Sequence, residues 1–185
     1  MQDWRYPDLR HVAGVIFLAA AAAIAGALAF EHGAGLRPCK LCLLQRNPYY
    51  LALVLAALVA VLPLGRGARR WGVGLLALVF LVSAGLGAYH AGVEWGFWAG
   101  PSDCGATSAP AAGSVGDFMT SLQTTRVVSC TEAAWRFLGL SLADWNALIS
   151  LALADLALVT ALGRGFLFGR KDPAEKPYGS SSLSQ

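Results

Sequence analysis

The amino-acid sequence predicts an all-α membrane protein, a four-helix transmembrane bundle. The chain of 185 residues is 56% hydrophobic and only 14% charged, whereas a typical soluble domain is about 25% charged. Its mean hydropathy is +0.54. The apolar residues gather in four long runs that lack the alternation of strands. Because backbone groups in lipid must be satisfied internally, such runs can cross a bilayer only as helices.

Each run is long enough to span the hydrocarbon core, which takes roughly 17–25 residues. The predicted spans cover residues 12–30, 47–64, 71–89 and 145–162. The first run has an alternative interpretation as a cleaved secretory signal, since Arg5 and Arg10 precede it and Ala27-Leu28-Ala29 ends it. It is longer than the roughly 7–15 apolar residues of a signal peptide, which favours a span.

The distribution of lysine and arginine predicts that both termini are cytoplasmic, because basic residues in short flanks mark the inner side. In that orientation nine basic residues lie inside and five lie in two periplasmic loops, at about 31–46 and 90–144. The net charge of +3 therefore reflects topology and indicates no nucleic-acid partner. We expect one transmembrane domain over residues 1–165 and a disordered cytoplasmic tail over 166–185.

All four cysteines fall in the predicted outer loops, Cys39 and Cys42 in the first and Cys104 and Cys130 in the second. An even number of cysteines on the oxidising side favours disulfides over free thiols. A zinc site normally pairs two C-x2–4-C motifs, or one such motif with closely spaced histidines. Here there is one such motif and the other cysteines are 26 positions apart, so we predict no metal site.

The Cys39-Lys40-Leu41-Cys42 motif is predicted to be a redox-active pair. A disulfide across so small a loop would add little stability, because the stabilisation grows with loop length. Pro38 suits the first position of a helix, and Lys40 and Arg46 bring positive charge nearby. A helix N-terminus and nearby cations lower a thiol pKa and favour the thiolate. For the second pair of cysteines, a structural staple and a redox role stay equally open.

Arg46 has two interpretations. It follows Cys42 by four residues, so a continuous helix places both side chains on one face. There the guanidinium could neutralise a thiolate and donate hydrogen bonds to a carbonyl oxygen on a bound ring. Alternatively, Arg46 is an interfacial anchor whose head reaches the lipid headgroups. Its position alone does not decide between the two.

The second outer loop has an apolar face at helical spacing after Ser114, formed by Val115, Phe118, Met119 and Leu122. This pattern predicts a short interfacial helix, lying on the bilayer or packed over the mouth of the bundle.

Polar residues also occur just before the fourth span and near its middle. Ser141 and Asp144 have the spacing of a helix-capping pattern before this span. Asp155 falls near the middle of that span, where acids are functional candidates by default. We favour a structural role, with a protonated Asp155 bonded to Ser83 or to a backbone carbonyl.

Several segments carry a resemblance to one family. Residues 37–46, RPCKLCLLQR, resemble the first outer loop of DsbB, the bacterial disulfide bond formation protein B family. Residues 130–141, CTEAAWRFLGLS, followed by Trp145-Asn146, resemble its second loop. Residues 89–95, YHAGVEW, look like the branch common in alphaproteobacterial and related members. The resemblance extends from about residue 10 to 165, with the segments in the family's order and spacing.

The resemblance implies an enzyme of the bacterial inner membrane, a multi-pass protein that reoxidises the periplasmic thiol oxidase DsbA with a quinone. Carried over by position, Cys104 is attacked by the reduced partner and Cys130 is then released to exchange with Cys39. Cys42 becomes the thiolate that interacts with the quinone, and Arg46 supports that step. The chain departs from the family at Gln45, where a glutamate is common, so the way Arg46 is held comes into question.

Redox potentials agree with a quinone acceptor, either ubiquinone or menaquinone. DsbA has a potential of about −120 mV, so glutathione at about −200 mV or below cannot accept its electrons. The sequence has no flavin or nucleotide fingerprint. His90, at the outer end of the third span, is open to two interpretations: it contacts the quinone or relays protons, or it is an interfacial hydrogen-bonding residue.

Two other functional classes remain as alternatives. One is a membrane scaffold or transporter with structural disulfides. The other is an oxidase resembling vitamin K epoxide reductase, but that family places its quinone-side C-x-x-C after the loop cysteines, and the order here is reversed.

Overall fold

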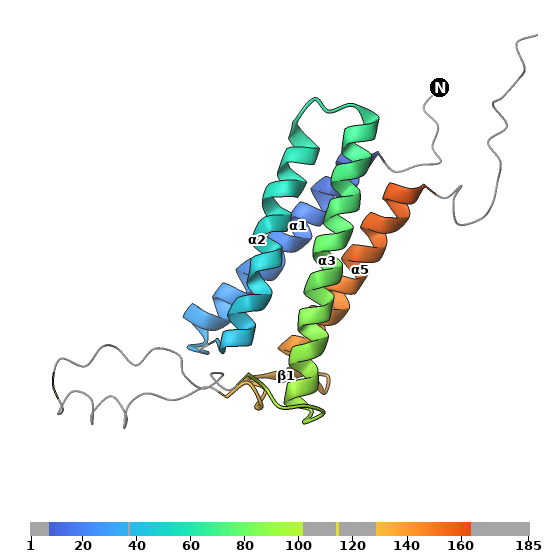
Figure 1. The fold of residues 1–185 in the computed structure, drawn as a ribbon. Helices are drawn as coiled ribbons and strands as arrows, with labels where there is room; N and C mark the ends of the chain where they lie inside the picture. The colour runs from blue at the N-terminus through green and yellow to red at the C-terminus, as the bar shows by residue number, and fades with distance from the viewer. Residues whose placement is uncertain (1–7, 37, 102–113, 115–128, 164–185) are drawn as a thin grey trace, which may run out of the picture.

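Four long helices form a bundle, and their loops gather at its two ends (Figure 1). The structure, a computed structural model, describes residues 8–36, 38–101, 114 and 129–163. Each of the four helices is long and apolar enough to cross a membrane, which confirms the predicted all-α membrane fold. The helices are α1 (Leu9–Leu28, continued by the π-helical turn η1, Ala29–Gly33), α2 (Lys40–Val61), α3 (Arg66–Glu94) and α5 (Leu142–Leu162).

All four helices begin before the predicted apolar segments, most of all α2, whereas α2 ends at Val61, short of the predicted residue 64. We predicted Pro38 at the first helical position, but the helix starts at Lys40 and Cys39 is its N-cap. The reason is local, since the Cys39 sulfur accepts a hydrogen bond from the Cys42 backbone N–H at 3.3 Å. The C-x-x-C motif therefore forms the first turn of the helix.

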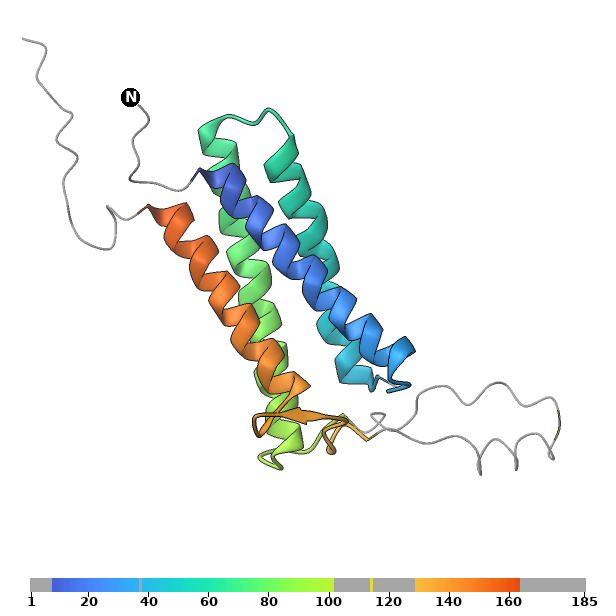
Figure 2. The same ribbon diagram turned by 180° about the vertical axis from the view of Figure 1, so that it is seen from behind.

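Two arginines close one end of the bundle. Arg10 donates from Nε to the carbonyl of Ala60 at 2.9 Å, and Arg70 donates to the carbonyls of Ala161 and Leu162. Cations suit helix C-termini, where carbonyls lack partners within the helix. These contacts place the start of α1 beside the end of α2 and the start of α3 beside the end of α5, all at one end of the bundle (Figure 2). That this end is cytoplasmic stays a prediction.

Alanine is the commonest residue in the core between the helices, where it lets helix backbones approach closely in a membrane protein. Larger side chains such as Ile16, Leu76 and Phe80 fill the remaining space and are fully buried. Gly87 brings α3 against α5, because a Cβ there would lie 2.8 Å from the Ala147 backbone nitrogen. This close approach sets His90, one turn further along α3, beside α5.

A buried chain of hydroxyl groups links α2, α5 and α3 inside the bundle. The Tyr49 hydroxyl and Ser150 Oγ are 2.9 Å apart, and Ser150 Oγ donates to Ser83 Oγ at 2.9 Å. The proposed bond between Ser83 and Asp155 was therefore wrong. Ser150 is on the buried face of α5, whereas Asp155 is exposed on the outside of the bundle.

A two-stranded hairpin precedes α5, with β1 (Arg136–Phe137) pairing antiparallel with β2 (Leu140–Ser141). Its two turn residues have positive φ, 54° at Leu138 and 82° at Gly139, as the tight turns favoured in hairpins require. Glycine tolerates this backbone freely, and Leu138 is held there by the pairing.

The predicted capping pattern at the start of α5 is confirmed. Asp144 N–H donates to Ser141 Oγ at 3.2 Å, and Ser141 N–H donates to the Asp144 carboxylate at 2.8 Å. The two bonds form a capping box. Other predictions lie outside the described residues: the interfacial helix beyond Ser114, the placement of Cys104 and the tail from residue 166.

Candidate functional site

The structure places Cys39 and Cys42 as two free thiols at the start of α2. Their sulfurs are 2.8 Å apart, and Cys39 is buried. The even number of cysteines led us to expect disulfides. A redox-active pair exists either as a disulfide or as two thiols, and the structure has Cys39 and Cys42 in the reduced, dithiol state. The same two side chains need only small rotations to form a bond.

Cys39, which lies just before the membrane span, has its pKa lowered to about 4. The main cause is the hydrogen bond from the Cys42 thiol; burial opposes the shift, and hydrogen bonds from His90 and from the Cys42 backbone add to it. Cys39 is thus the thiol that corresponds to the thiolate predicted at a helix N-terminus. Direct hydrogen bonds, rather than the charges of Lys40 and Arg46, are its largest causes.

A third sulfur lies close to this pair. Cys130 is buried and disulfide-bonded, and its Sγ, a His90 ring nitrogen and the Cys39 Sγ all lie within 4.8 Å of one another. A sulfur in a disulfide is not the thiolate that a metal binds, so this grouping favours thiol–disulfide exchange. Cys104 lies outside the described residues.

His90 is held by a chain of side-chain amides. Its Nδ1 is 2.6 Å from the Gln45 side-chain amide, and Asn146 donates to Gln45 Oε1 at 2.5 Å. The other ring nitrogen, Nε2, is 3.6 Å from the Cys39 sulfur. Gln45, the departure from the resembled family, is thus buried against His90 and positions its ring.

Arg46 is held by an acid that we did not select from the sequence. Its Nη1 is 2.5 Å from Glu31 Oε2 in the π-helical turn after α1, and the two side chains are only 14% and 26% exposed. One signal could have identified Glu31, because it is the only acidic residue in the predicted first outer loop, 31–46. The ion pair fixes the guanidinium beside the cysteine pair.

A cavity of about 270 Å³ opens beside these residues, close to the lower end of the range for small-molecule pockets. Its wall is largely apolar, and small residues of α1, including Ala23 and Gly26, make room in it. Figure 2 shows α1 and α5 diverging toward this end, and both contribute to the wall. The polar part of the wall contains Cys39, Cys42, Arg46, His90 and Glu94.

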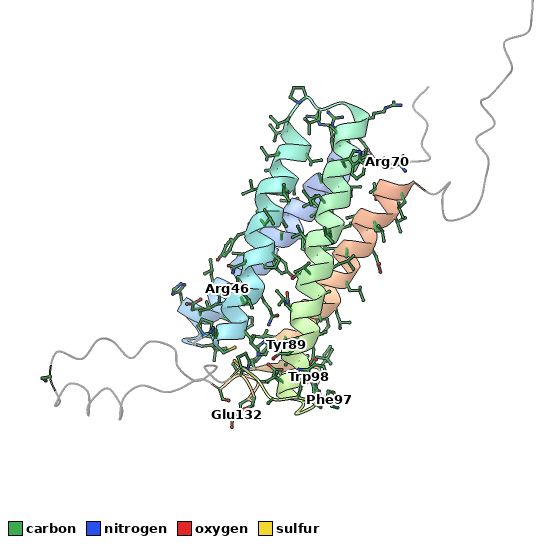
Figure 3. All side chains as sticks on the ribbon, in the orientation of Figure 1. Arg46, Arg70, Tyr89, Phe97, Trp98 and Glu132 are labelled. Atoms are coloured by element: carbon green, nitrogen blue, oxygen red, sulfur yellow. The ribbon has the colours of Figure 1, made fainter. Side chains whose placement is uncertain are left out.

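The side chains of the site all lie at one end of the bundle. Figure 3 shows Arg46 and Glu132 at this end and Arg70 at the other. Tyr89 stacks on Trp98, with ring centroids 5.9 Å apart, at the same end as the site. Tyrosine and tryptophan favour the membrane–water interface, so the cysteine pair lies near that boundary.

Fold and site together define a class, the membrane-embedded thiol–disulfide oxidoreductases. A dithiol with a stabilised thiolate lies beside a disulfide sulfur, at the end of a transmembrane bundle and at the wall of a pocket.

Comparison with known proteins identifies the family. Residues 9–160 match the family model described as disulfide bond formation protein DsbB, and the chain belongs to that family. It is 35% identical over 166 residues to disulfide bond formation protein B of Marinobacter nauticus, covering 84% of this chain and 93% of the relative. It is 32% identical to that of a Polaromonas species, with the same coverages. It is 34% identical to that of Verminephrobacter eiseniae, covering 89% and 93%. No solved structure matches the chain.

Proposed function

We propose that this protein is a quinone-dependent thiol oxidase of the bacterial inner membrane. It takes two electrons from a periplasmic DsbA-type dithiol protein and passes them to ubiquinone or menaquinone, which sustains protein disulfide formation. The observation that carries the proposal is the Cys39 sulfur within 4.8 Å of the disulfide-bonded Cys130 sulfur, at the wall of a pocket.

The donor side works by thiol–disulfide exchange. The reduced partner attacks the disulfide that contains Cys130, with Cys104 as the sulfur attacked, and releases the Cys130 thiolate. That thiolate attacks Cys39 of an oxidised Cys39–Cys42 pair, and Cys42 leaves as a thiolate. The partner's second thiol then breaks its mixed disulfide with Cys104, so the partner leaves oxidised and Cys104 is released as a thiolate. That thiolate attacks Cys130 and displaces Cys39, so both electrons reside on the Cys39–Cys42 dithiol. The described state, with two free thiols beside a disulfide-bonded Cys130, corresponds to this stage.

The residues around the pocket fit a quinone ring. Arg46, fixed by Glu31, offers hydrogen-bond donors to a ring carbonyl, and Cys42 is on the same wall. The apolar face of α1 suits the remainder of a lipid-soluble molecule. A bound quinone supplies an acceptor for two electrons and two protons.

The test is quinone reduction by the purified full-length protein in detergent. With a reduced DsbA-type protein and a short-chain ubiquinone, the quinone absorbance should fall in a thiol-dependent manner. Cys39→Ser should reduce the rate to background. Cys130→Ser, mixed with the oxidised partner, should accumulate a mixed disulfide, because the Cys104 thiolate attacks the partner's disulfide and Cys130 is absent to release it. A purely structural pair of disulfides would leave Cys39→Ser fully active, and that result would overturn the proposal.

A further inference from the structure

Glu94, the last residue of α3, is a buried acid that the exchange reaction does not use. Its side chain is only 5% exposed, and it is part of the pocket wall. The Ser141 hydroxyl interacts with the carboxyl group, yet Oε2 has no hydrogen-bond partner among the described residues. An unsatisfied buried oxygen is costly, so its persistence calls for a functional explanation.

One histidine nitrogen faces both this acid and the reactive sulfur. His90 is one helical turn before Glu94, and its Nε2 is 3.6 Å from Glu94 Oε1 and 3.6 Å from Cys39 Sγ. The Gln45 amide holds the opposite side of the ring through Nδ1. The ring therefore presents Nε2 to both groups, and a small tilt brings it closer to either one.

The other charged groups near Glu94 have partners of their own. Arg46 pairs with Glu31, and the Arg136 guanidinium lies 4.9 Å from the centroid of the Trp95 ring. Among the described residues, His90 is the basic side chain within ion-pair distance of Glu94. The titratable and charged groups that surround the carboxyl are His90 on α3, Cys39 and Cys42 at the start of α2, Arg136 on β1, Asp144 on α5, and Glu31, Arg46 and Glu132 on the pocket wall.

We propose that Glu94, acting through His90, stores the proton that Cys39 releases and returns it to the electron acceptor in the pocket. The inference rests on the proposed function, since it concerns the same dithiol and the same acceptor. It makes Glu94 a residue that positions a proton for the reaction, while the cysteines carry the electrons.

The balance of protons shows why such a residue is needed. Reduction of a quinone to a quinol consumes two electrons and two protons, and both electrons come from the dithiol as the Cys39–Cys42 bond forms. Cys42, whose Sγ is 2.8 Å from the Cys39 Sγ and whose hydrogen bond lowers the Cys39 pKa, still carries its own proton. Because Cys39 is a thiolate, its proton must be held elsewhere, and the His90–Glu94 pair keeps it beside the pocket. The two stored protons then match the two electrons.

The experiment uses full-length protein whose Cys39–Cys42 pair has been reduced and freed of reductant. A short-chain ubiquinone is added anaerobically, and the single-turnover rate of quinol formation is followed between pH 6 and 8. The wild-type rate should change little with pH, because the proton is already stored. In Glu94→Gln the rate should fall as pH rises, by about tenfold for each pH unit, since the second proton must then come from water.

Two variants serve as controls. Asp155→Asn removes one carboxyl from the exposed face of α5 and should keep the wild-type rate and pH profile. Glu94→Asp keeps the acid and should restore a nearly flat profile, which a merely structural role for the Glu94 side chain would not explain. Thermal unfolding of each variant establishes that the protein assayed is folded.

The outcomes separate this inference from the proposed function. If wild-type protein reduces no quinone, the proposed function fails and the inference fails with it. If wild-type protein is active and Glu94→Gln has the same rate and pH profile, the inference alone is overturned. The same holds if Glu94→Gln fails to fold and Glu94→Asp, although folded, shows a rate that falls steeply with pH.

Discussion

The two ends of the bundle use charged residues in opposite ways. At one end Arg10 and Arg70 donate to backbone carbonyls at the C-termini of α2 and α5, which completes the hydrogen bonding of those helices. At the other end Arg46 is paired with an acid at the wall of a pocket, and a thiolate forms at a helix N-terminus. The comparison teaches that a basic residue near a span boundary completes the hydrogen bonding of a helix end when it meets backbone carbonyls, whereas one paired with an acid at a pocket wall is left available to a ligand.

The largest effect should follow from removing the Cys42 thiol, because its hydrogen bond is the main cause of the low Cys39 pKa. In Cys42→Ala the Cys39 pKa should rise from about 4 toward the ordinary value of about 8.5. In the wild type, Cys39 is almost fully ionised at pH 7, which is well above its pKa. In the variant, the thiolate fraction at pH 7 should be about ten- to thirtyfold lower. Titration of the thiolate ultraviolet absorbance measures this change. An unchanged midpoint would show that His90 and the backbone N–H of residue 42 keep the Cys39 pKa low without the Cys42 thiol.

The next effect concerns the cation at the pocket. Arg46→Met should raise the KM for a short-chain ubiquinone by about tenfold or more, since a charge-assisted hydrogen bond contributes roughly 1.5–3 kcal/mol. Glu31→Gln should raise it less, because the guanidinium is then present but no longer fixed. Arg66→Met, at the opposite end of the bundle, should keep the wild-type KM in the same assay. A KM in Arg46→Met equal to that of wild type would support the anchor interpretation instead.

At the opposite end the effect should be on stability alone. Arg70→Met leaves the carbonyls of Ala161 and Leu162 without their donors, so the free energy of unfolding should fall by about 1–3 kcal/mol. The rate of quinone reduction per folded protein should not change. Chemical unfolding in detergent gives the first quantity, and the assay of quinone absorbance gives the second. A loss of activity without a loss of stability would contradict the division between the two ends.

The smallest effect on stability is expected in the interior of the bundle, between its two ends. Ser83→Ala removes the acceptor at one end of the buried hydroxyl chain, and such interhelical bonds contribute about 0.6 kcal/mol on average. We expect a small decrease in unfolding free energy and an unchanged KM for ubiquinone. A decrease several times larger would mean that the chain from Tyr49 through Ser150 to Ser83 acts as one cooperative network.

Much of the site could be recognised along the chain, because its signals are local. The C-x-x-C motif, the arginine four residues later and the capping box at Ser141 each lie within a few residues, where helix geometry relates side chains directly. Other parts gave no such signal. Glu31 contacts Arg46 from another helix, and Gln45 is recognisable in the sequence only as a departure from a resembled family.

The sequence by itself determined that this protein is solvated by a membrane, the number of its spans and the short spacing of its C-x-x-C pair, because hydropathy and short spacings are properties of contiguous segments. Only the tertiary structure decided which distant residues meet. The close approach of α3 to α5 at Gly87 and the packing of α2 against α3 bring His90 and Glu94 to the cysteine pair, with Cys130 beside them. Contacts between helices depend on packing in three dimensions, and no spacing along the chain records them.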